Sequence, residues 1–111
     1  MSGTTTTTTP ERKTREEHEV QKQPPYHVIL HNDDDHSYDY VIRMLKQLFG
    51  YPEPKGFLLA FEVDKSGRAV VYTTTKEHAE LKQEQIHAFG PDPGIARCQG
   101  SMTAVIEPAP G

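Results

Sequence analysis

A short apolar strand that runs directly into a polar turn constrains the fold of this chain most strongly. The segment Tyr26 to His31 (YHVILH) is β-branched and aromatic, and residues 32–35 (NDDD) stop it. Such a run predicts a buried strand that ends in a turn. Apolar residues then recur at helical spacing over residues 40–49, and Gly50 follows where a helix end favours glycine. The sequence therefore predicts a strand, a polar turn and an amphipathic helix in succession.

Helix and strand patterns alternate along the rest of the chain. Asp35 or Ser37 is expected to cap the first helix. The later segments are a second helix from about Pro52 to before Gly67, a strand over residues 68–72, a third helix from Thr75 to about Phe89, a loop over residues 90–101 and a strand over residues 102–107. The order β-α-α-β-α-β predicts an α+β fold, a small three-stranded antiparallel sheet with three helices on one face.

The N-terminal segment has a different composition. Residues 1–24 contain only two apolar side chains, Met1 and Val20, and they include six consecutive threonines. So few apolar groups cannot offset the entropy lost on folding. We expect residues 1–24 to be a disordered extension and residues 25–109 to form a single core domain.

Composition excludes several classes of protein. The net charge of −4 lies in residues 25–111, which carry 12 acidic and 8 basic side chains, so nucleic acid is not an expected partner. No apolar run approaches the roughly 18 residues that span a bilayer, and the N-terminus has no secretory pattern. A single cysteine excludes a disulfide framework and a CxxC zinc site. The expected location is a reducing cytoplasm, without membrane contact.

The turn over residues 31–37 (HNDDDHS) is the densest group of polar side chains, and three interpretations are open. Asx residues can form the turn and cap the helix. His31, Asp33, Asp35 and His36 are metal-ligand types, but their spacing matches no common metal motif. An amide oxygen and carboxylates can also bind an ammonium group. No cofactor is expected.

Catalysis is not expected from the sequence. The chain has no G-x-S-x-G motif and no Gly-rich phosphate loop. Cys98 has no credible general base near it in the sequence, and a cysteine needs such a neighbour to act as a nucleophile. The sequence therefore indicates a protein that is not an enzyme.

Two blocks of sequence resemble the ClpS adaptor family. The stretch PPYHVILHNDD, followed by YDYVIRMLKQLF, is similar to the start of the family's core domain. Residues 75–82 (TKEHAELK) are similar to the family's T-x-E-x-A-E-x-K helix start. Residues 58–61 (LLAF) and 67–69 (GRA) match shorter family segments between them. The resemblance covers roughly residues 24–107.

The resemblance implies an adaptor that binds N-degron substrates and delivers them to a Clp AAA+ unfoldase. An N-degron is a bulky hydrophobic N-terminal residue with a free α-amine, and the implied partner is the N-domain of ClpA or ClpC. Carried over by position, the substrate-binding residues are Asn32, Asp33, Asp34, His36, Tyr38, Val41, Leu58, Phe61, Glu62 and Met102. The residues that would contact the unfoldase are Glu77, Glu80 and Lys82.

The chain departs from the family pattern at the proposed site. Glu62 stands where the family has a histidine that binds the α-amine, and two extra residues precede Gly67. Tyr38 and Phe61 are larger than the usual Met and Val. Other roles remain open, because the apolar site residues can be core residues, and acidic residues in a first helical turn favour the helix dipole. The alternative function is a small metal-binding, ligand-binding or ribosome-associated α+β domain.

Overall fold

The computed structural model describes residues 23–110 apart from residues 34, 96, 97 and 99. Most of the predicted extension over residues 1–24 lies outside the described residues. The elements, in chain order, are β1 (Tyr26–His31), α2 (Tyr38–Phe49), α3 (Glu53–Ser66), β2 (Arg68–Thr74), α4 (Lys76–His87) and β3 (Ala104–Pro108). This order confirms the predicted β-α-α-β-α-β arrangement.

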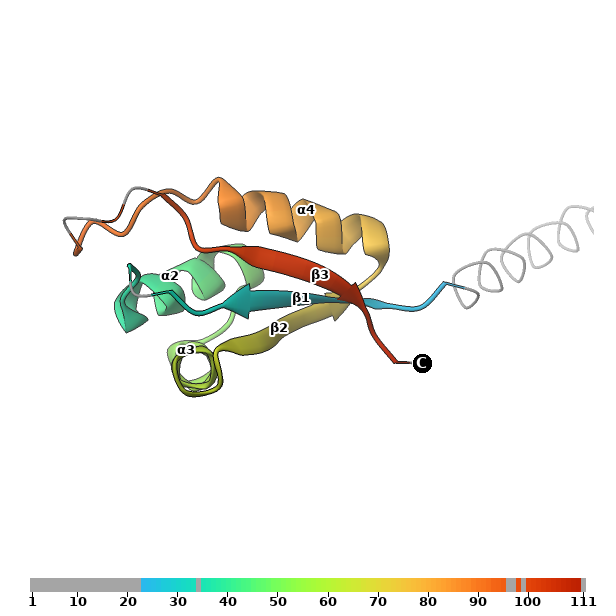
Figure 1. The fold of residues 1–111 in the computed structure, drawn as a ribbon, viewed down its shortest axis with the longest axis horizontal. Helices are drawn as coiled ribbons and strands as arrows, with labels where there is room; N and C mark the ends of the chain where they lie inside the picture. The colour runs from blue at the N-terminus through green and yellow to red at the C-terminus, as the bar shows by residue number, and fades with distance from the viewer. Residues whose placement is uncertain (1–22, 34, 96–97, 99, 111) are drawn as a thin grey trace, which may run out of the picture.

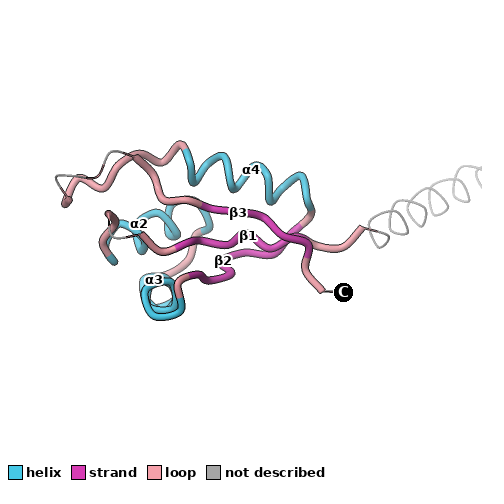
Figure 2. The backbone as a smooth tube through the Cα atoms, in the orientation of Figure 1, coloured by secondary structure: helices cyan, strands magenta, loops and turns pink. Residues whose placement is uncertain are grey.

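The three strands form one antiparallel sheet with β1 in the centre (Figures 1 and 2). Leu30 pairs with Ala69 of β2 on one side and with Ala104 of β3 on the other. A central strand has its backbone groups paired along both edges, which suits the uncharged run that the sequence places there. The predicted antiparallel sheet is confirmed.

One face of the sheet packs against the helices. Side chains alternate between the faces of a strand, so Val28 and Leu30 enter the main core while Ile29 points to the opposite face. The helices contribute the predicted apolar stripe of α2 and smaller residues of α3 and α4: Tyr40, Val41, Met44, Leu45, Ala60, Val63, Ala79 and Ile86. This packing confirms the three helices on one face.

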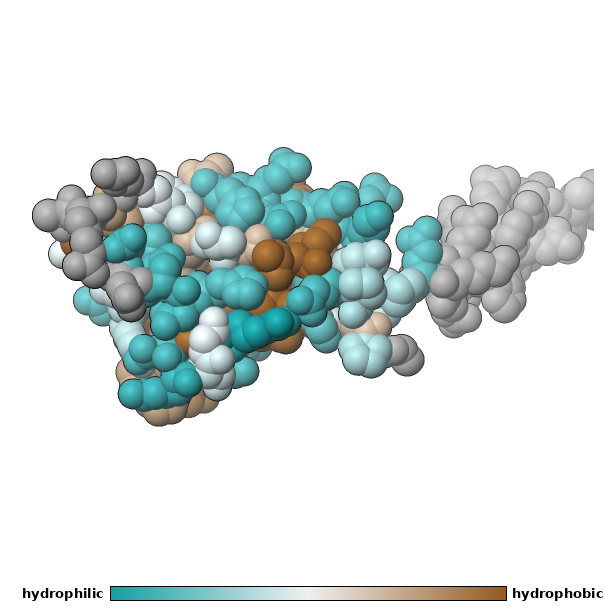
Figure 3. Space-filling model, in the orientation of Figure 1, coloured by the Kyte–Doolittle hydropathy of each residue, from teal (hydrophilic) through white to brown (hydrophobic). Residues whose placement is uncertain are grey.

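The opposite face of the sheet carries a small apolar patch. Ile29 is fully buried between its cross-strand neighbours Val70 and Val105. An ion pair between Arg68 and Glu107 (3.1 Å) lies on the two flanking strands. Figure 3 shows apolar side chains gathered over the middle of the sheet, on the face turned to the viewer.

Helix ends follow the expected capping chemistry. Ser37, not Asp35, caps α2, because its side-chain oxygen accepts a hydrogen bond from the backbone N–H of Tyr40 (3.2 Å). Gly50 and Gly67 end α2 and α3 with φ of 72° and 86°, which residues with a Cβ adopt at a cost. No helix in the described ranges is long and apolar enough to cross a bilayer.

Several element boundaries differ from the predictions. Helix α4 ends at His87 instead of about Phe89, because the backbone of Ala88 already leaves helical geometry (φ −97°, ψ 1°). Strand β2 continues to Thr74 instead of residue 72, and β3 begins at Ala104 instead of residue 102. Pairing with β1 fixes both strands, and a sequence pattern does not show where pairing stops.

Helices α2 and α3 approach closely at Gly56. A Cβ built on Gly56 would lie 3.3 Å from the Cα of Ile42 in α2. A glycine inside a helix costs about 1 kcal/mol relative to alanine. The close approach explains this glycine, because a larger residue at this position would push α3 away from α2.

Candidate functional site

The polar turn lies at the end of β1 and is held by the backbone. The N–H of Asn32 donates to the carbonyl oxygen of Gly67 (2.9 Å), which ties the turn to the start of β2. Asp33 Oδ1 accepts a hydrogen bond from the N–H of Asp35 (2.9 Å), which is an Asx turn. The Asn32 side chain is exposed at this end of the sheet. Asp34 lies outside the described residues.

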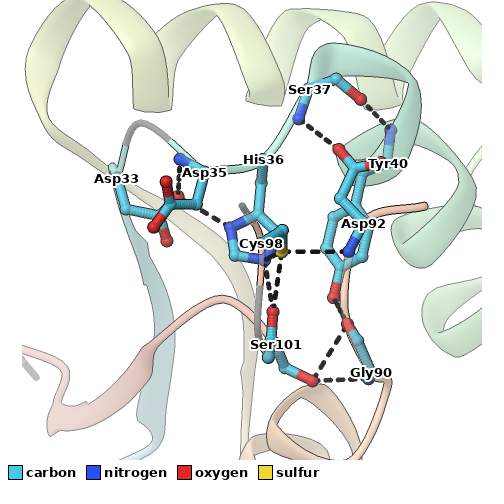
Figure 4. Close-up of polar contacts among 10 residues, drawn as sticks. Asp33, Asp35, His36, Ser37, Tyr40, Gly90, Asp92, Cys98 and Ser101 are labelled. Carbon is cyan, nitrogen blue, oxygen red and sulfur yellow. Dashed lines mark hydrogen bonds and ion pairs between the residues drawn. The ribbon is translucent and has the colours of Figure 1, made fainter. Parts of the chain in front are cut away.

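His36 connects the turn to the loop over residues 90–101. Its Nδ1 lies 2.7 Å from Asp33 Oδ1, and its Nε2 lies 2.7 Å from the carbonyl oxygen of Gly100 (Figure 4). The ring also packs against the ring of Tyr40, with centroids 4.5 Å apart. Only 4% of the His36 side chain is exposed. The structure therefore places His36 beneath the turn, where it orients Asp33.

Asp92 is the second connection between the loop and the turn. Its carboxylate accepts hydrogen bonds from the N–H of Ser37 (2.7 Å) and of Gly94 (2.8 Å), although the residue is only 4% exposed. Burial acts to raise the pKa of Asp92, but these bonds and the charge of His36 outweigh it, so the pKa lies below its usual value of 3.8. Asp92 thus acts as a buried carboxylate that fixes the start of α2.

Tyr40 and Ser101 complete this connection. The Tyr40 hydroxyl donates to the carbonyl oxygen of Gly90 (2.5 Å), and Ser101 Oγ accepts from the N–H of Gly90 (2.6 Å). Burial raises the pKa of the Tyr40 hydroxyl, so it stays a neutral donor. The sequence patterns do not predict this network. Asp92 is 55 residues from Ser37 and Gly90 is 50 residues from Tyr40, and no local pattern signals such contacts.

The sequence-based interpretation of Cys98 is wrong in one respect. No base stands near Cys98 in the sequence, but the fold brings His36 Nε2 to 3.3 Å from its sulfur. The residues are 62 positions apart, so only the folded loop brings them together. Cys98 is partly buried and has a free thiol.

The apolar residues of the expected site fall into two groups. Val41 and Met102 are 4% and 2% exposed and belong to the main core, which was the alternative interpretation for them. Leu58 and Phe61 are 66% and 46% exposed on α3. Glu62 is exposed on the same helix. The exposed residues Leu58, Phe61 and Glu62 thus all lie on α3. Val41 of α2 and Met102 of the loop before β3 are buried.

Tyr38 joins the two helices at the surface. Its hydroxyl donates to Asp64 Oδ2 (2.8 Å), and this bond raises the pKa of Tyr38. The Tyr38 ring lies 5.6 Å from Phe57, and Phe57 stacks on Phe61 with centroids 6.4 Å apart. An aromatic row therefore runs from the start of α2 along the outer side of α3.

A cavity lies beside this row, between α2 and α3. Its volume is about 470 Å³, and it is lined by Ile42, Glu53, Pro54, Phe57 and Leu58. The lining is largely apolar, so the surface next to the aromatic row can receive a hydrophobic side chain.

The expected partner-binding residues all lie on α4, but they do not form one exposed surface. Glu77 and Glu80 are exposed, whereas the Lys82 ammonium donates to the carbonyl oxygen of Leu48 at the end of α2 (2.6 Å). Lys82 thus stabilises the C-terminus of α2. Glu77 instead borders a cavity of about 650 Å³, together with Gln23, Pro24, Pro25, Thr75, Lys76, His78 and Leu81.

Metal binding receives no structural support in the described residues. No three His, Cys, Asp or Glu side chains among them are close enough to hold an ion. In the turn, the Asp33 carboxylate is engaged by Asp35 and His36. We therefore do not propose a metal site.

The structure is a small α+β domain with a polar turn at the end of β1 and an exposed apolar surface on α3. Residues 21–93 match the family model described as "ATP-dependent Clp protease adaptor protein ClpS". The chain therefore belongs to the ClpS family.

Individual relatives agree with this assignment. The chain is 39% identical over 51 residues to a ClpS protein of Mycobacterium marinum, covering 46% of this chain and 50% of that protein. It is 34% identical over 58 residues to one of Mycobacterium tuberculosis, covering 52% and 57%. It thus spans about half the length of the curated relatives it matches. The solved structure of Agrobacterium tumefaciens ClpS2 bound to L-phenylalaninamide superposes with a TM-score of 0.67 at 27% identity, covering 78% of this chain and 98% of that one.

Proposed function

We propose that this chain is an adaptor that binds N-degron substrates and delivers them to a Clp AAA+ unfoldase. The observation that carries the proposal is the turn of Asn32 and Asp33, fixed at the end of β1 beside the exposed apolar surface of α3. The similar ClpS2 of A. tumefaciens was solved with L-phenylalaninamide, which has a free α-amine and an aromatic side chain. A cytoplasmic location is part of this proposal.

The turn residues suit the recognition of a free α-amine. A protonated amine has three donors and no acceptor, so an amide oxygen and carboxylates can bind it with charge-assisted hydrogen bonds. An internal peptide offers one N–H and would leave those acceptors unpaired. Asn32 carries the exposed amide, and the contacts of Asp33 with Asp35 and His36 fix the orientation of its carboxylate.

The apolar surface of α3 suits recognition of the first side chain. Leu58 and Phe61 are exposed there, and Ile42 of α2 lines the adjacent cavity with Leu58. Burying a Leu or Phe side chain contributes about 1.5–3 kcal/mol, which is enough to separate bulky apolar residues from small or charged ones. Tyr38, which contacts both Asp64 and Phe57, would border this site.

The test of this function compares two forms of one peptide. A fluorescent peptide that begins with Leu should bind with its amine free and should lose at least tenfold in affinity when the amine is acetylated. Fluorescence anisotropy of the full chain measures both affinities. Equal affinity for the two forms would refute amine recognition and would favour a general ligand-binding domain.

Glu62 is proposed to bind the α-amine in place of the family's histidine. It is exposed on α3, where a carboxylate can approach a ligand amine without prior burial. Glu62→Gln should weaken the free-amine peptide severalfold and reduce the dependence of its affinity on salt, since screening acts on charged pairs. Asp39→Asn, at an exposed position of α2, is the matched control. An unchanged affinity and salt dependence for Glu62→Gln would show that Glu62 does not touch the ligand.

The partner surface is proposed to include Glu77 and Glu80. Glu77 borders the cavity at the start of α4, and Leu81, 47% exposed, supplies an apolar contact beside it. Lys82 is proposed to act indirectly, by holding α4 against the end of α2.

Glu77→Lys should lose most of the affinity for the N-domain of ClpA or ClpC and keep the affinity for peptide. A surface that complements Glu77 would repel a lysine at this position. Such repulsion lowers the association rate as well as the affinity. Glu84→Lys makes the same charge change near the other end of α4 and should bind normally. Surface plasmon resonance with the immobilised N-domain measures this, and equal loss in both variants would contradict a localised docking site.

A further inference from the structure

The cavity between α2 and α3 lies toward the N-terminal end of α3. It is lined by Ile42, Glu53, Pro54, Phe57 and Leu58, and four of these five side chains are apolar. Phe57 and Leu58 are 47% and 66% exposed although they are large and apolar. A cavity of about 470 Å³ with such a lining has room for a hydrophobic side chain of a ligand.

The cavity and the polar turn are separated along α3. The turn joins the C-terminal end of this helix, because the N–H of Asn32 donates to the carbonyl oxygen of Gly67 (2.9 Å). Phe57 precedes Gly67 by ten residues, which corresponds to about 15 Å along a helix. A single Leu or Phe residue is too short to fill the cavity while its own α-amine contacts the turn.

An aromatic surface connects the turn with the cavity. The Tyr38 hydroxyl donates to Asp64 Oδ2 near the end of α3 (2.8 Å), and the Tyr38 ring lies 5.6 Å from the ring of Phe57. Phe61 stacks on Phe57 with centroids 6.4 Å apart. Phe57 also lines the cavity. A peptide that leaves the turn along α3 would therefore pass Phe61 before it reaches the cavity.

The geometry of an extended peptide fits this separation. Its residues advance about 3.3 Å each, so the third residue lies about 7 Å beyond the first, and its side chain covers most of the remaining distance. The side chains of residues one and three point to the same side, whereas that of residue two points to the opposite side. A first side chain against Phe61 would therefore bring the third side chain toward the cavity.

We propose that the cavity between α2 and α3 binds the side chain of the third residue of a substrate peptide and selects for an apolar one. This inference rests on the proposed function, because the α-amine at the turn sets the register of the peptide. Ile42 of α2 and Pro54, Phe57 and Leu58 of α3 supply the apolar contacts.

The charge at the rim of the cavity adds a second selection. Glu53 is the one charged side chain among the described residues that line the cavity, and it is exposed. The nearby Lys55 does not line the cavity, and its ammonium lies 3.9 Å from the centre of the Tyr51 ring. A carboxylate on the third residue would meet the like charge of Glu53, so an acidic third residue should be disfavoured.

Four peptides that differ only in residues two and three test the position. They begin Leu-Gly-Phe, Leu-Phe-Gly, Leu-Gly-Ser and Leu-Gly-Asp, and they share one soluble tail with a fluorescent label. In anisotropy titrations with the full chain, Leu-Gly-Phe should bind about tenfold more tightly than Leu-Gly-Ser, because it buries a large apolar side chain. Leu-Phe-Gly should bind like Leu-Gly-Ser, and Leu-Gly-Asp should bind severalfold more weakly than either. Equal affinity of Leu-Gly-Phe and Leu-Gly-Ser, or of Leu-Gly-Phe and Leu-Phe-Gly, would overturn the proposal.

Two substitutions locate the selection on α3. Leu58→Ser should bring the affinities for Leu-Gly-Phe and Leu-Gly-Ser close together, whereas Leu81→Ser changes an exposed leucine of α4 and should keep their ratio. The ratio cancels any loss of affinity for the first residue. Glu53→Gln should remove the penalty against Leu-Gly-Asp, and Glu84→Gln on α4 should not. Circular dichroism shows whether each variant is folded, and an unchanged ratio in a folded Leu58→Ser would contradict a third-residue site at this cavity.

The same assay separates this inference from the proposed function. Leu-Gly-Ser is measured with its amine free and with its amine acetylated. A preference for the free amine without a preference for Leu-Gly-Phe over Leu-Gly-Ser would refute the third-residue site alone. Equal binding of the free and acetylated forms of Leu-Gly-Ser would refute the proposed function, and the inference that rests on it would fail as well.

Discussion

Asn32→Ala should weaken the binding of a free-amine peptide by about 1.5–3 kcal/mol, roughly tenfold to more than a hundredfold. That range applies to a hydrogen bond with a charged partner, here the ligand's α-ammonium group. The Asn32 side chain is exposed, and its backbone N–H keeps the bond to Gly67 in the variant. The free energy of unfolding should therefore stay nearly constant, so that the loss is a loss of binding.

A matched control keeps this prediction specific. Gln47→Ala removes an exposed amide of α2 and should leave the affinity unchanged. Isothermal titration calorimetry with a Leu-starting peptide measures all three proteins. If Asn32→Ala binds as tightly as the wild type, Asn32 serves only as part of the turn, and the amine must be bound elsewhere.

Asp92→Ala should lower the free energy of unfolding by about 2 kcal/mol or more, because each buried donor left unpaired costs about 1–3 kcal/mol. The substitution removes the acceptor for the N–H groups of Ser37 and Gly94, so the start of α2 and the loop would separate. For a domain of this size the midpoint of thermal unfolding should fall by about 10 °C. Urea denaturation provides an independent measurement, and an unchanged midpoint would contradict an anchoring role.

The pH dependence of stability separates the contribution of the Asp92 charge from that of its hydrogen-bonding oxygen. Its pKa in the folded protein lies below the usual 3.8, so its contribution is present above that pH and is lost as pH falls through the lower value. Asp92→Asn keeps one acceptor oxygen and should lose less stability at pH 7. It should also flatten the acid limb of the stability curve. An acid limb identical to that of the wild type would show that Asp92 is not ionised in the fold.

Much of the fold follows from local sequence patterns. The apolar stripe of α2 ends at Gly50, and the structure shows the matching buried side chains and the positive φ there. The polar turn follows β1, and the Asp33 carboxylate accepts from the backbone N–H of Asp35 within it. Such features depend on residues a few positions apart, which a sequence shows directly.

The environment of the site depends on contacts that no local pattern records. Asp92 accepts a hydrogen bond from the N–H of Ser37, 55 residues away, and His36 meets Cys98 only when the loop folds back. The sequence groups Lys82 with Glu77 and Glu80 on the surface of one helix. In the structure its ammonium donates to the carbonyl oxygen of Leu48 at the end of α2. In each case a long-range contact gives a residue a role that its neighbours in the sequence do not suggest.

The most direct test of the central claim is an NMR titration of the ¹⁵N-labelled chain with L-phenylalaninamide and with its N-acetyl derivative. We predict chemical-shift changes at Asn32 and Asp33 and along Leu58 to Glu62 with the free amine, and much smaller changes with the acetylated compound. Changes confined to the cavity around Thr75 to Leu81, or equal responses to the two compounds, would contradict an amine-binding site at this turn.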